Sequence, residues 1–366
     1  MSFNVIPAPE HLQATDLSQW TARSLVNYEQ HPAYAELTKS AGLSTRLKAL
    51  RRFLPSLAVI KVKRAIRYEM IPLHIRKSSD FSGWLAKAKV ALSHLFQFNA
   101  THNVALDAPG LTELDRSFRR QGCAVIAAPD SAFQHIAALS RPNFERLETR
   151  RAAQRDGARD FEASRSYARR DEAKALFEAI EDLFTQSGVF DTAQAYLGRK
   201  IKLIDVNPQI NDPSDDFWRR VFPDLQQPTP SCAYFHRDAS GGDIKVIVYM
   251  SDVGPDNGPF GYVIGSHLMP LQRADDHVSE ANDSNGMAGT GPENRRCFAA
   301  LPEAWRHKGA FGNDVLDDTP LAEAIQGGLW AITGSKGCIV MFDTKGVHRG
   351  GMVVQGERRV ITCVLG

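Results

Sequence analysis

The stretch His236-Arg237-Asp238 lies near the start of an apolar run, and His348 and Arg359 come much later in the chain. In a β-strand, residues two apart point to the same face of the sheet. His236 and Asp238 can therefore present an imidazole and a carboxylate on one side of a strand, while Arg237 points away. The pattern predicts a strand that directs two polar side chains at one point.

His348 supplies a third side chain of a type that binds metal ions. It follows the apolar segment 337–342, Gly-Cys-Ile-Val-Met-Phe, which has the composition of a buried strand. The segment 357–365 predicts another strand that returns beside it. Two histidines and one carboxylate on one side of an ion leave open positions on the other side, which is the arrangement in non-haem Fe(II) oxygenases.

The segment 257–267, which lies between these parts, reads Asn-Gly-Pro-Phe-Gly-Tyr-Val-Ile-Gly-Ser-His. With these motifs in this order, the chain resembles the phytanoyl-CoA dioxygenase-like family of Fe(II)/2-oxoglutarate oxygenases. That family has a His-x-Asp, an Asn-Gly-Pro turn leading into a Pro-Gly-Ser-His-like loop, and a distal histidine followed by an arginine. This chain departs from the pattern at Ile264, where the family usually has proline, and at Gly350, where a hydroxyl residue often helps to hold the co-substrate.

The resemblance implies a mainly β fold with flanking helices, built on a double-stranded β-helix, which is a jelly-roll or cupin-like core. It implies that His236, Asp238 and His348 bind Fe(II), and that Arg359 binds the distal carboxylate of 2-oxoglutarate. The implied co-substrates are 2-oxoglutarate and O2, and the products include succinate and CO2. Halogenating relatives replace the carboxylate of Asp238 with a small residue, so its presence predicts a hydroxylation or a related oxidation.

Arg358 is the rival of Arg359 for the co-substrate. Only one of two adjacent strand residues can face the interior of a barrel. The spacing of the family selects Arg359, and Arg358 would then face outward or pair with Glu357. Lys202 and Asn207 are weaker candidates for co-substrate contacts, because polar side chains at strand ends are commonly solvated.

Several other motifs favour ordinary structural roles. His267 is expected to order a loop near the mouth of the site. Ser266 does not fit a hydrolase nucleophile, because the surrounding sequence lacks the second glycine of a nucleophile elbow. Zinc hydrolysis with the same ligands is disfavoured, since no general base is evident beside them. The remaining histidines are interpreted as surface or core residues: His11, His31, His74, His94, His102, His135, His277 and His307.

Composition agrees with a large domain and a smaller appendage. The chain has 366 residues, of which 43% are hydrophobic, and its formal net charge of +2 indicates no bulk polyanion as partner. The cysteines number five and are scattered, which favours buried free thiols in a reducing compartment. The sequence has no signal-like amino terminus and no long apolar run, so we expect a cytoplasmic protein without a transmembrane segment.

The chain divides into a helical amino-terminal region, 1–108, and an oxygenase domain, 109–366. The domain should open with a helix from Leu111 to Gly122 that leads into a strand at 123–127. A second helix is predicted at 173–184 and a strand at 200–206. The segment 268–329 separates the two halves of the motif, and it is either a lid over the substrate or a surface insertion.

A cluster of basic residues in the amino-terminal region is either a solvated face or a docking surface for something acidic, such as a phosphate-bearing substrate, a carrier protein or an anionic membrane. Nucleic acid is not expected, because exposed aromatic residues are not interleaved with the basic ones. The cluster comprises Arg46, Lys48, Arg51, Arg52, Lys61, Lys63, Arg64 and Arg67.

The sequence therefore predicts an Fe(II)/2-oxoglutarate-dependent oxygenase that hydroxylates a small molecule, with phosphate-bearing or carrier-bound compounds among the candidate substrates. The alternative is a jelly-roll protein that binds a metal or a partner without turnover. Conversion of 2-oxoglutarate to succinate would separate the two. The substrate and the oligomeric state do not follow from the sequence, because members of one fold differ mainly in their loops.

Overall fold

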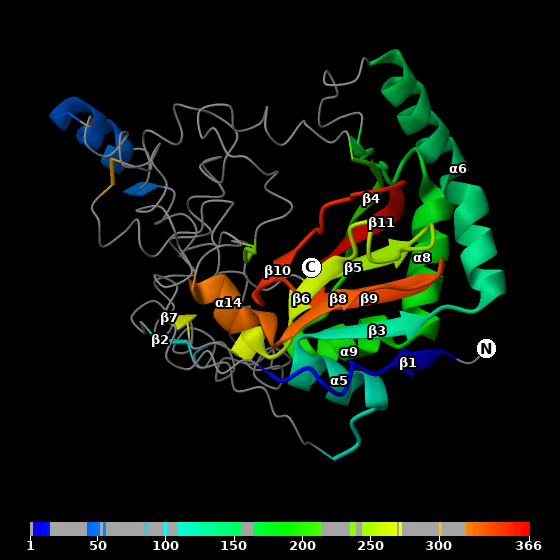
Figure 1. The fold of residues 1–366 in the computed structure, drawn as a ribbon, viewed down its shortest axis with the longest axis horizontal. Helices are drawn as coiled ribbons and strands as arrows, with labels where there is room; N and C mark the ends of the chain where they lie inside the picture. The colour runs from blue at the N-terminus through cyan, green and yellow to red at the C-terminus, as the bar shows by residue number, and fades with distance from the viewer. Residues whose placement is uncertain are drawn as a thin grey trace.

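The computed structural model describes the parts of the chain that build the sheets and the helices around them (Figure 1). The described residues are 3–14, 42–51, 54–55, 85, 99–100, 109–154, 164–213, 235–238, 244–268, 271–272, 300–301 and 320–366.

The chain from residue 109 opens with the predicted helix and strand. Helix α5 (Glu113–Gln121) begins at a capping box, in which the hydroxyl of Thr112 accepts from the Asp115 amide while the Asp115 carboxylate accepts from the Thr112 amide. It ends at Gly122, whose φ of 79° is a left-handed conformation that glycine adopts at little cost. Strand β3 (Cys123–Ala127) follows at once.

Three further helices cover one face of the main sheet (Figure 1). They are α6 (Asp130–Ala153), α8 (Lys174–Gln186) and α9 (Val189–Leu197). The predicted helix at 173–184 is thus confirmed as α8, and its stripe of Leu176, Ile180 and Leu183 is buried as expected. The short elements α14 (Pro320–Gln326) and η3 (Ser266–Leu268) lie nearer the second sheet.

The main sheet is antiparallel and has the order β1-β3-β9-β5-β11-β4. Its remaining strands are β1 (Asn4–Ile6), β9 (Cys338–Asp343), β5 (Ile244–Tyr249), β11 (Arg358–Leu365) and β4 (Leu203–Asn211). The strands expected at 337–342 and 357–365 are present, but they are not neighbours because β5 lies between them. The strand expected at 200–206 begins later and runs further, as β4.

A second antiparallel sheet has the order β10-β6-β8. These strands are β10 (His348–Arg349), β6 (Phe260–Val263) and β8 (Leu329–Ile332). A backbone bridge between His236 and His348 extends this sheet beyond β10. Strands β2 (Asn99–Ala100) and β7 (Leu271–Gln272) pair separately.

The central strands β9 and β5 of the main sheet are buried on both faces, which explains their continuous apolar runs. In β9, Ile339 and Met341 pack toward the helices. The alternate residues Cys338, Val340 and Phe342 pack against Tyr262 and other residues of the second sheet. The two sheets therefore face each other across an apolar core, and the domain is sheet-rich with flanking helices as predicted.

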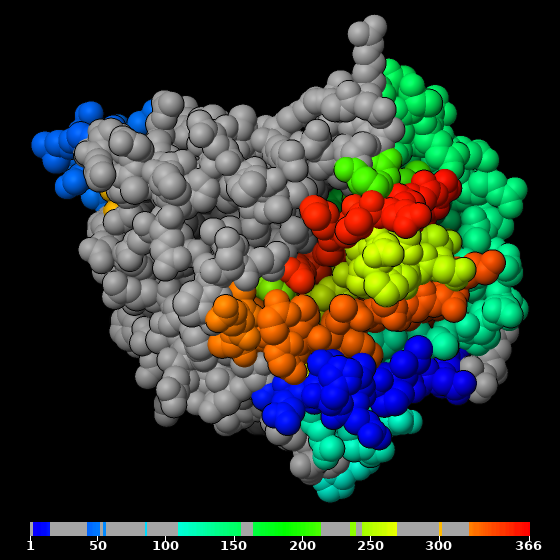
Figure 2. All heavy atoms as spheres, in the orientation of Figure 1, coloured from blue at the N-terminus to red at the C-terminus, as the bar shows by residue number. Residues whose placement is uncertain are grey.

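The helical amino-terminal region is not confirmed. Residues 43–51 are helical, but most of 1–108, including most of the basic cluster, lies outside the described residues. The first residues form strand β1, which pairs with β3 and extends the main sheet. Figure 2 shows residues 3–14, in blue, along the edge of the described surface, where the Gln13 amide donates to the Gly327 carbonyl.

Most of the predicted insertion, 268–329, is also outside the described residues, so the choice between lid and surface insertion stays open. Within the part of the chain that is described, no helix is both long and apolar enough to cross a membrane.

Candidate metal centre

Backbone pairing brings the two halves of the motif together. The His236 amide donates to the His348 carbonyl at 2.9 Å, and the His348 amide donates to the His236 carbonyl at 2.8 Å. Two residues further along, the Asp238 amide donates to the Thr344 carbonyl at 3.0 Å. The short segment 235–238 is therefore aligned against the turn and strand that follow β9.

This pairing gathers the three predicted ligands. One ligand atom from each of His236, Asp238 and His348 lies within 4.8 Å of the other two. The Nε2 atom of His348 is 3.6 Å from Oδ2 of Asp238, and the centroids of the two imidazole rings are 4.5 Å apart. Among the described residues these three form a group that could hold a metal ion.

His348 is held in the tautomer that leaves Nε2 unprotonated and able to bind a metal ion. Its Nδ1 atom lies 2.9 Å from the carbonyl oxygen of Gly346. A carbonyl can only accept, so Nδ1 carries the proton and the lone pair of Nε2 faces Asp238. Metal-binding histidines commonly donate their second ring N–H in this way.

The surroundings of His348 keep its imidazole neutral. Only 4% of the residue is exposed, and its ring packs against those of Phe260, Tyr262 and Phe342 at centroid distances of 5.8, 6.4 and 5.0 Å. Burial among these rings, as the main cause, and the nearby His236, as the second, lower the pKa of His348 to about 3. The neutral form is the one that binds metal ions.

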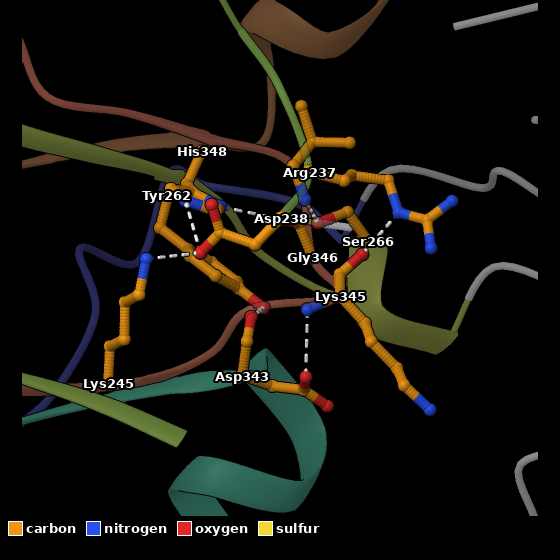
Figure 3. A network of polar contacts seen from close by, with 10 residues as sticks. Arg237, Asp238, Lys245, Tyr262, Ser266, Asp343, Lys345, Gly346 and His348 are labelled. Atoms are coloured by element: carbon orange, nitrogen blue, oxygen red, sulfur yellow. Dashed lines mark hydrogen bonds and ion pairs between the residues drawn. The ribbon is translucent and has the colours of Figure 1, made fainter. Parts of the chain in front are cut away.

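Lys245 is a site residue that the sequence analysis missed. Its Nζ atom donates to Oδ2 of Asp238 at 2.7 Å (Figure 3). Burial is the largest influence and would raise the pKa of Asp238, but the charge of Lys245, the neighbouring His348 and His236, and the hydrogen bond from Lys245 together outweigh it, so the pKa lies well below its usual range. The available signal was a single lysine inside the apolar strand Ile244–Tyr249.

Buried polar contacts fix the turn before His348 (Figure 3). The Asp343 carboxylate accepts from the Tyr196 hydroxyl at 2.6 Å and from the Lys345 amide at 2.9 Å. The Tyr262 hydroxyl donates to the Asp343 carbonyl at 3.1 Å. The Val347 amide donates to the Ser266 hydroxyl at 2.7 Å. The turn is thereby tied to α9, β6 and η3.

The prediction that Arg359 faces the barrel interior is wrong. Arg359 lies on the same face of β11 as Ile361, Cys363 and Leu365, which pack toward the helices. Its guanidinium forms ion pairs with Glu148 of α6 at 2.6 Å and with Glu357 at 2.5 Å.

Arg358 is the inward-facing arginine. It shares its face of β11 with Val360, which packs between the sheets. Its Nη1 atom donates to the carbonyl oxygens of Gly258 and Gly350, and Nη2 donates to Oδ1 of Asn211 at 3.3 Å. The pairing of β11 with β4 and β5 fixes which of its faces points inward, and this is the face of Arg358, opposite to the one that the sequence spacing suggested.

The Gly-Ser-His segment is internal rather than at the mouth of a site. His267 is 1% exposed, and its Nε2 atom lies 3.0 Å from the carbonyl oxygen of Arg119. Ser266 acts through the hydrogen bond to Val347 described above. Of the two weaker candidates, Asn207 is buried on β4 opposite Thr362, whereas Lys202 is exposed.

The residues present fit a divalent metal of the iron type. Two imidazoles and one carboxylate are the donors of the facial triad, and a fixed histidine tautomer supports ligation. Iron(II) in such a site would be held by His236, Asp238 and His348.

No family model matches the sequence. No curated protein matches it either. The chain is similar to solved structures that include AviO1 from Streptomyces viridochromogenes Tue57, with a TM-score of 0.38, 20% identity, and coverage of 69% of this chain and 93% of AviO1. The non-heme alpha ketoglutarate dependent carbocyclase SnoK from nogalamycin biosynthesis has a TM-score of 0.39 and 16% identity, with 70% and 84% covered.

A third similar structure is EctD from S. alaskensis with 2-oxoglutarate and 5-hydroxyectoine, with a TM-score of 0.43, 14% identity, and coverage of 74% of this chain and 82% of EctD.

Proposed function

We propose that this protein is an Fe(II)/2-oxoglutarate-dependent oxygenase that hydroxylates a small molecule. The observation that carries the proposal is the convergence of His236, Asp238 and His348 within 4.8 Å, with the ligating face of His348 set by its hydrogen bond to Gly346. The EctD structures, which contain Fe in one case and 2-oxoglutarate in another, agree with the expected cofactors.

We propose that the core is a double-stranded β-helix. Its main sheet would be β9-β5-β11-β4, and its second sheet would be the bridge at His236 followed by β10, β6 and β8. Along the sequence, the chain passes repeatedly from one sheet to the other, as it does in a jelly roll. Strands β1 and β3 extend this core at one edge.

We propose Arg358, rather than Arg359, as the group that binds the distal carboxylate of 2-oxoglutarate. A guanidinium presents a planar fork that matches a carboxylate. Arg358 points inward. Its guanidinium contacts the carbonyl of Gly350, which is only two residues after the candidate ligand His348 in the chain. Arg359 is instead engaged by two glutamates on the helix side of the sheet.

Bound Fe(II), together with 2-oxoglutarate and O2, supplies an oxidant that removes hydrogen from a substrate and leaves succinate and CO2. The protein's own part is to hold three ligands on one side of the ion, and to shield that side with the rings of Phe260, Tyr262 and Phe342. The retained carboxylate of Asp238 supports hydroxylation or a related oxidation over halogenation.

The test is an anaerobic titration of the metal-free protein with Fe(II) and then 2-oxoglutarate. We expect the visible charge-transfer band of a 2-oxo acid chelated to iron, and we expect His348→Ala to lose it. In air, the wild-type protein should convert 2-oxoglutarate to succinate, and the substrate can then be sought by screening small molecules for faster succinate release.

His135→Ala is the matched control, since His135 is an exposed residue of α6 far along the chain from the ligands. It should keep the band. Iron binding without the band in the wild-type protein would reject the oxygenase and favour the alternative of a metal-binding protein without turnover.

A further inference from the structure

Lys245 lies on the inner face of the main sheet. In β5, the residues of its parity, Ile247 and Tyr249, pack in the core between the sheets, while Ile244 and Val246 pack toward the helices. Lys245 pairs with Phe342 of β9 on one side and with Val364 of β11 on the other. A lysine at such a position is uncommon unless its charge is paired.

The partner of Lys245 is the carboxylate of the metal centre. Its Nζ atom is 2.7 Å from Oδ2 of Asp238, and the same oxygen is 3.6 Å from Nε2 of His348. The side chain of Lys245 is 29% exposed and that of Asp238 is 18% exposed, so the pair is largely removed from water. Figure 3 shows the lysine and His348 approaching this carboxylate from different directions.

We propose that Lys245 is a positioning residue of the metal centre, which holds the Asp238 carboxylate in the orientation that the metal ion needs. The inference rests on the proposed metal site and adds a residue to it. A carboxylate has about four lone-pair positions on its two oxygens, so one hydrogen bond to an ammonium leaves room for a metal ion. Ligating carboxylates are commonly hydrogen-bonded by a second group in this way.

The charges of the pair also suit the proposed co-substrate. Asp238 and Lys245 cancel each other, and histidines bind metals in their neutral form. A divalent ion would therefore leave the centre with two positive charges, and the proposed contact with Arg358 adds a third, so the site attracts a dicarboxylate such as 2-oxoglutarate.

The opposing possibility is that the ammonium merely competes with a metal ion for Oδ2. The two cases predict opposite effects of removing it. A positioning role predicts weaker metal binding without Lys245, whereas competition predicts equal or tighter binding.

The experiment titrates the metal-free, full-length protein with Co(II) and follows the visible absorption of the bound ion. We expect Lys245→Met to weaken Co(II) binding by about 10- to 100-fold and to alter the shape of the absorption bands, because the carboxylate loses its fixed orientation. Lys245→Arg keeps a positive donor and should restore the affinity to within about threefold of wild type. Co(II) affinity in Lys245→Met that equals or exceeds the wild-type value would overturn the proposal.

Lys336→Met is the matched control, because Lys336 is exposed and precedes the opposite end of β9. It should bind Co(II) like wild type. Should Lys245→Met not fold, Lys245→Leu provides the same comparison, because it also removes the donor. If the wild-type protein itself binds no Co(II), the proposed metal site fails; if wild type and Lys245→Met bind it equally, only the role of Lys245 fails.

Discussion

At the scale of single residues, Arg358 and Arg359 show how one step along a strand changes a role. Arg358 reaches the loops at Gly258 and Gly350 on the inner face, while Arg359 pairs with Glu148 and Glu357 on the outer face. Both residues are charged. Strand alternation requires that they point to opposite faces, but it does not say which of the two points inward. The packing of β11 decides between them.

We expect Arg358→Gln to raise the dissociation constant of 2-oxoglutarate by about 10- to 100-fold, because a hydrogen bond to a charged group contributes roughly 1.5–3 kcal/mol. Arg359→Gln should change it by less than about threefold, since its guanidinium pairs with Glu148 and Glu357 on the helix side of the sheet, where such partly exposed pairs contribute little. The measurement is the 2-oxoglutarate dependence of the charge-transfer band in each Fe(II)-loaded variant. A larger effect at Arg359 would instead support Arg359 as the residue that binds the distal carboxylate of 2-oxoglutarate.

At the scale of elements, the metal centre depends on how a turn is tied to its neighbours. Helix α5 ends at Gly122, which lies directly against Tyr262 and His267. A Cβ atom at this position would be only 2.4 Å from both the Tyr262 hydroxyl and Nδ1 of His267. Tyr262 in turn holds the Asp343 carbonyl at the start of the turn that leads to His348. A single glycine therefore allows a helix end, an inner strand and the turn to approach closely.

Gly122→Ala tests this close approach, and Gly198→Ala is its control. Both glycines cap a helix with positive φ, 79° and 64°, but among the described residues no atom lies within 4 Å of a Cβ at Gly198. Gly198→Ala should lower the free energy of unfolding by about 1–2 kcal/mol, the cost of the left-handed conformation. Gly122→Ala should lose roughly 1–3 kcal/mol more through overpacking. Urea unfolding of both variants measures the two losses in the free energy of unfolding. Equal losses would contradict the close approach of Tyr262 and His267 to Gly122.

At the scale of the whole molecule, the candidate ligands join segments that are far apart in the sequence. His236 and Asp238 precede β5, whereas His348 follows β9, and both segments meet at the edge of the second sheet. A metal ion bound to all three would link these segments in the folded state and not in the unfolded chain.

Metal binding should therefore stabilise the fold. At a free Co(II) concentration about 100 times the dissociation constant, the free energy of unfolding should rise by about 2.7 kcal/mol. Thermal unfolding with Co(II), and again after a chelator is added, measures the change and its reversal. Asp238→Ala should show a much smaller response, and an equal response in that variant would mean that the stabilising ion binds elsewhere.

The local elements and the identity of the three candidate ligands could be predicted from the sequence. The helix that ends at Gly122, the strand that follows it, helix α8 and strands β9 and β11 each follow from local signals: a cap, a glycine, or an apolar period. The His-x-Asp spacing and the distal histidine could be recognised because strand geometry and ligand chemistry restrict which residue types can work together.

The face of each strand that points inward, and the contacts of the ligands, could not be predicted from the sequence, because they depend on tertiary packing. Arg358 points inward, and Lys245 forms a hydrogen bond with Asp238. The first residues of the chain join the main sheet as β1. The physical reason is that a strand buried on both faces has no polar face to mark its outside, so its orientation depends on pairing and packing with distant segments. Those contacts are not encoded in any local stretch of the chain.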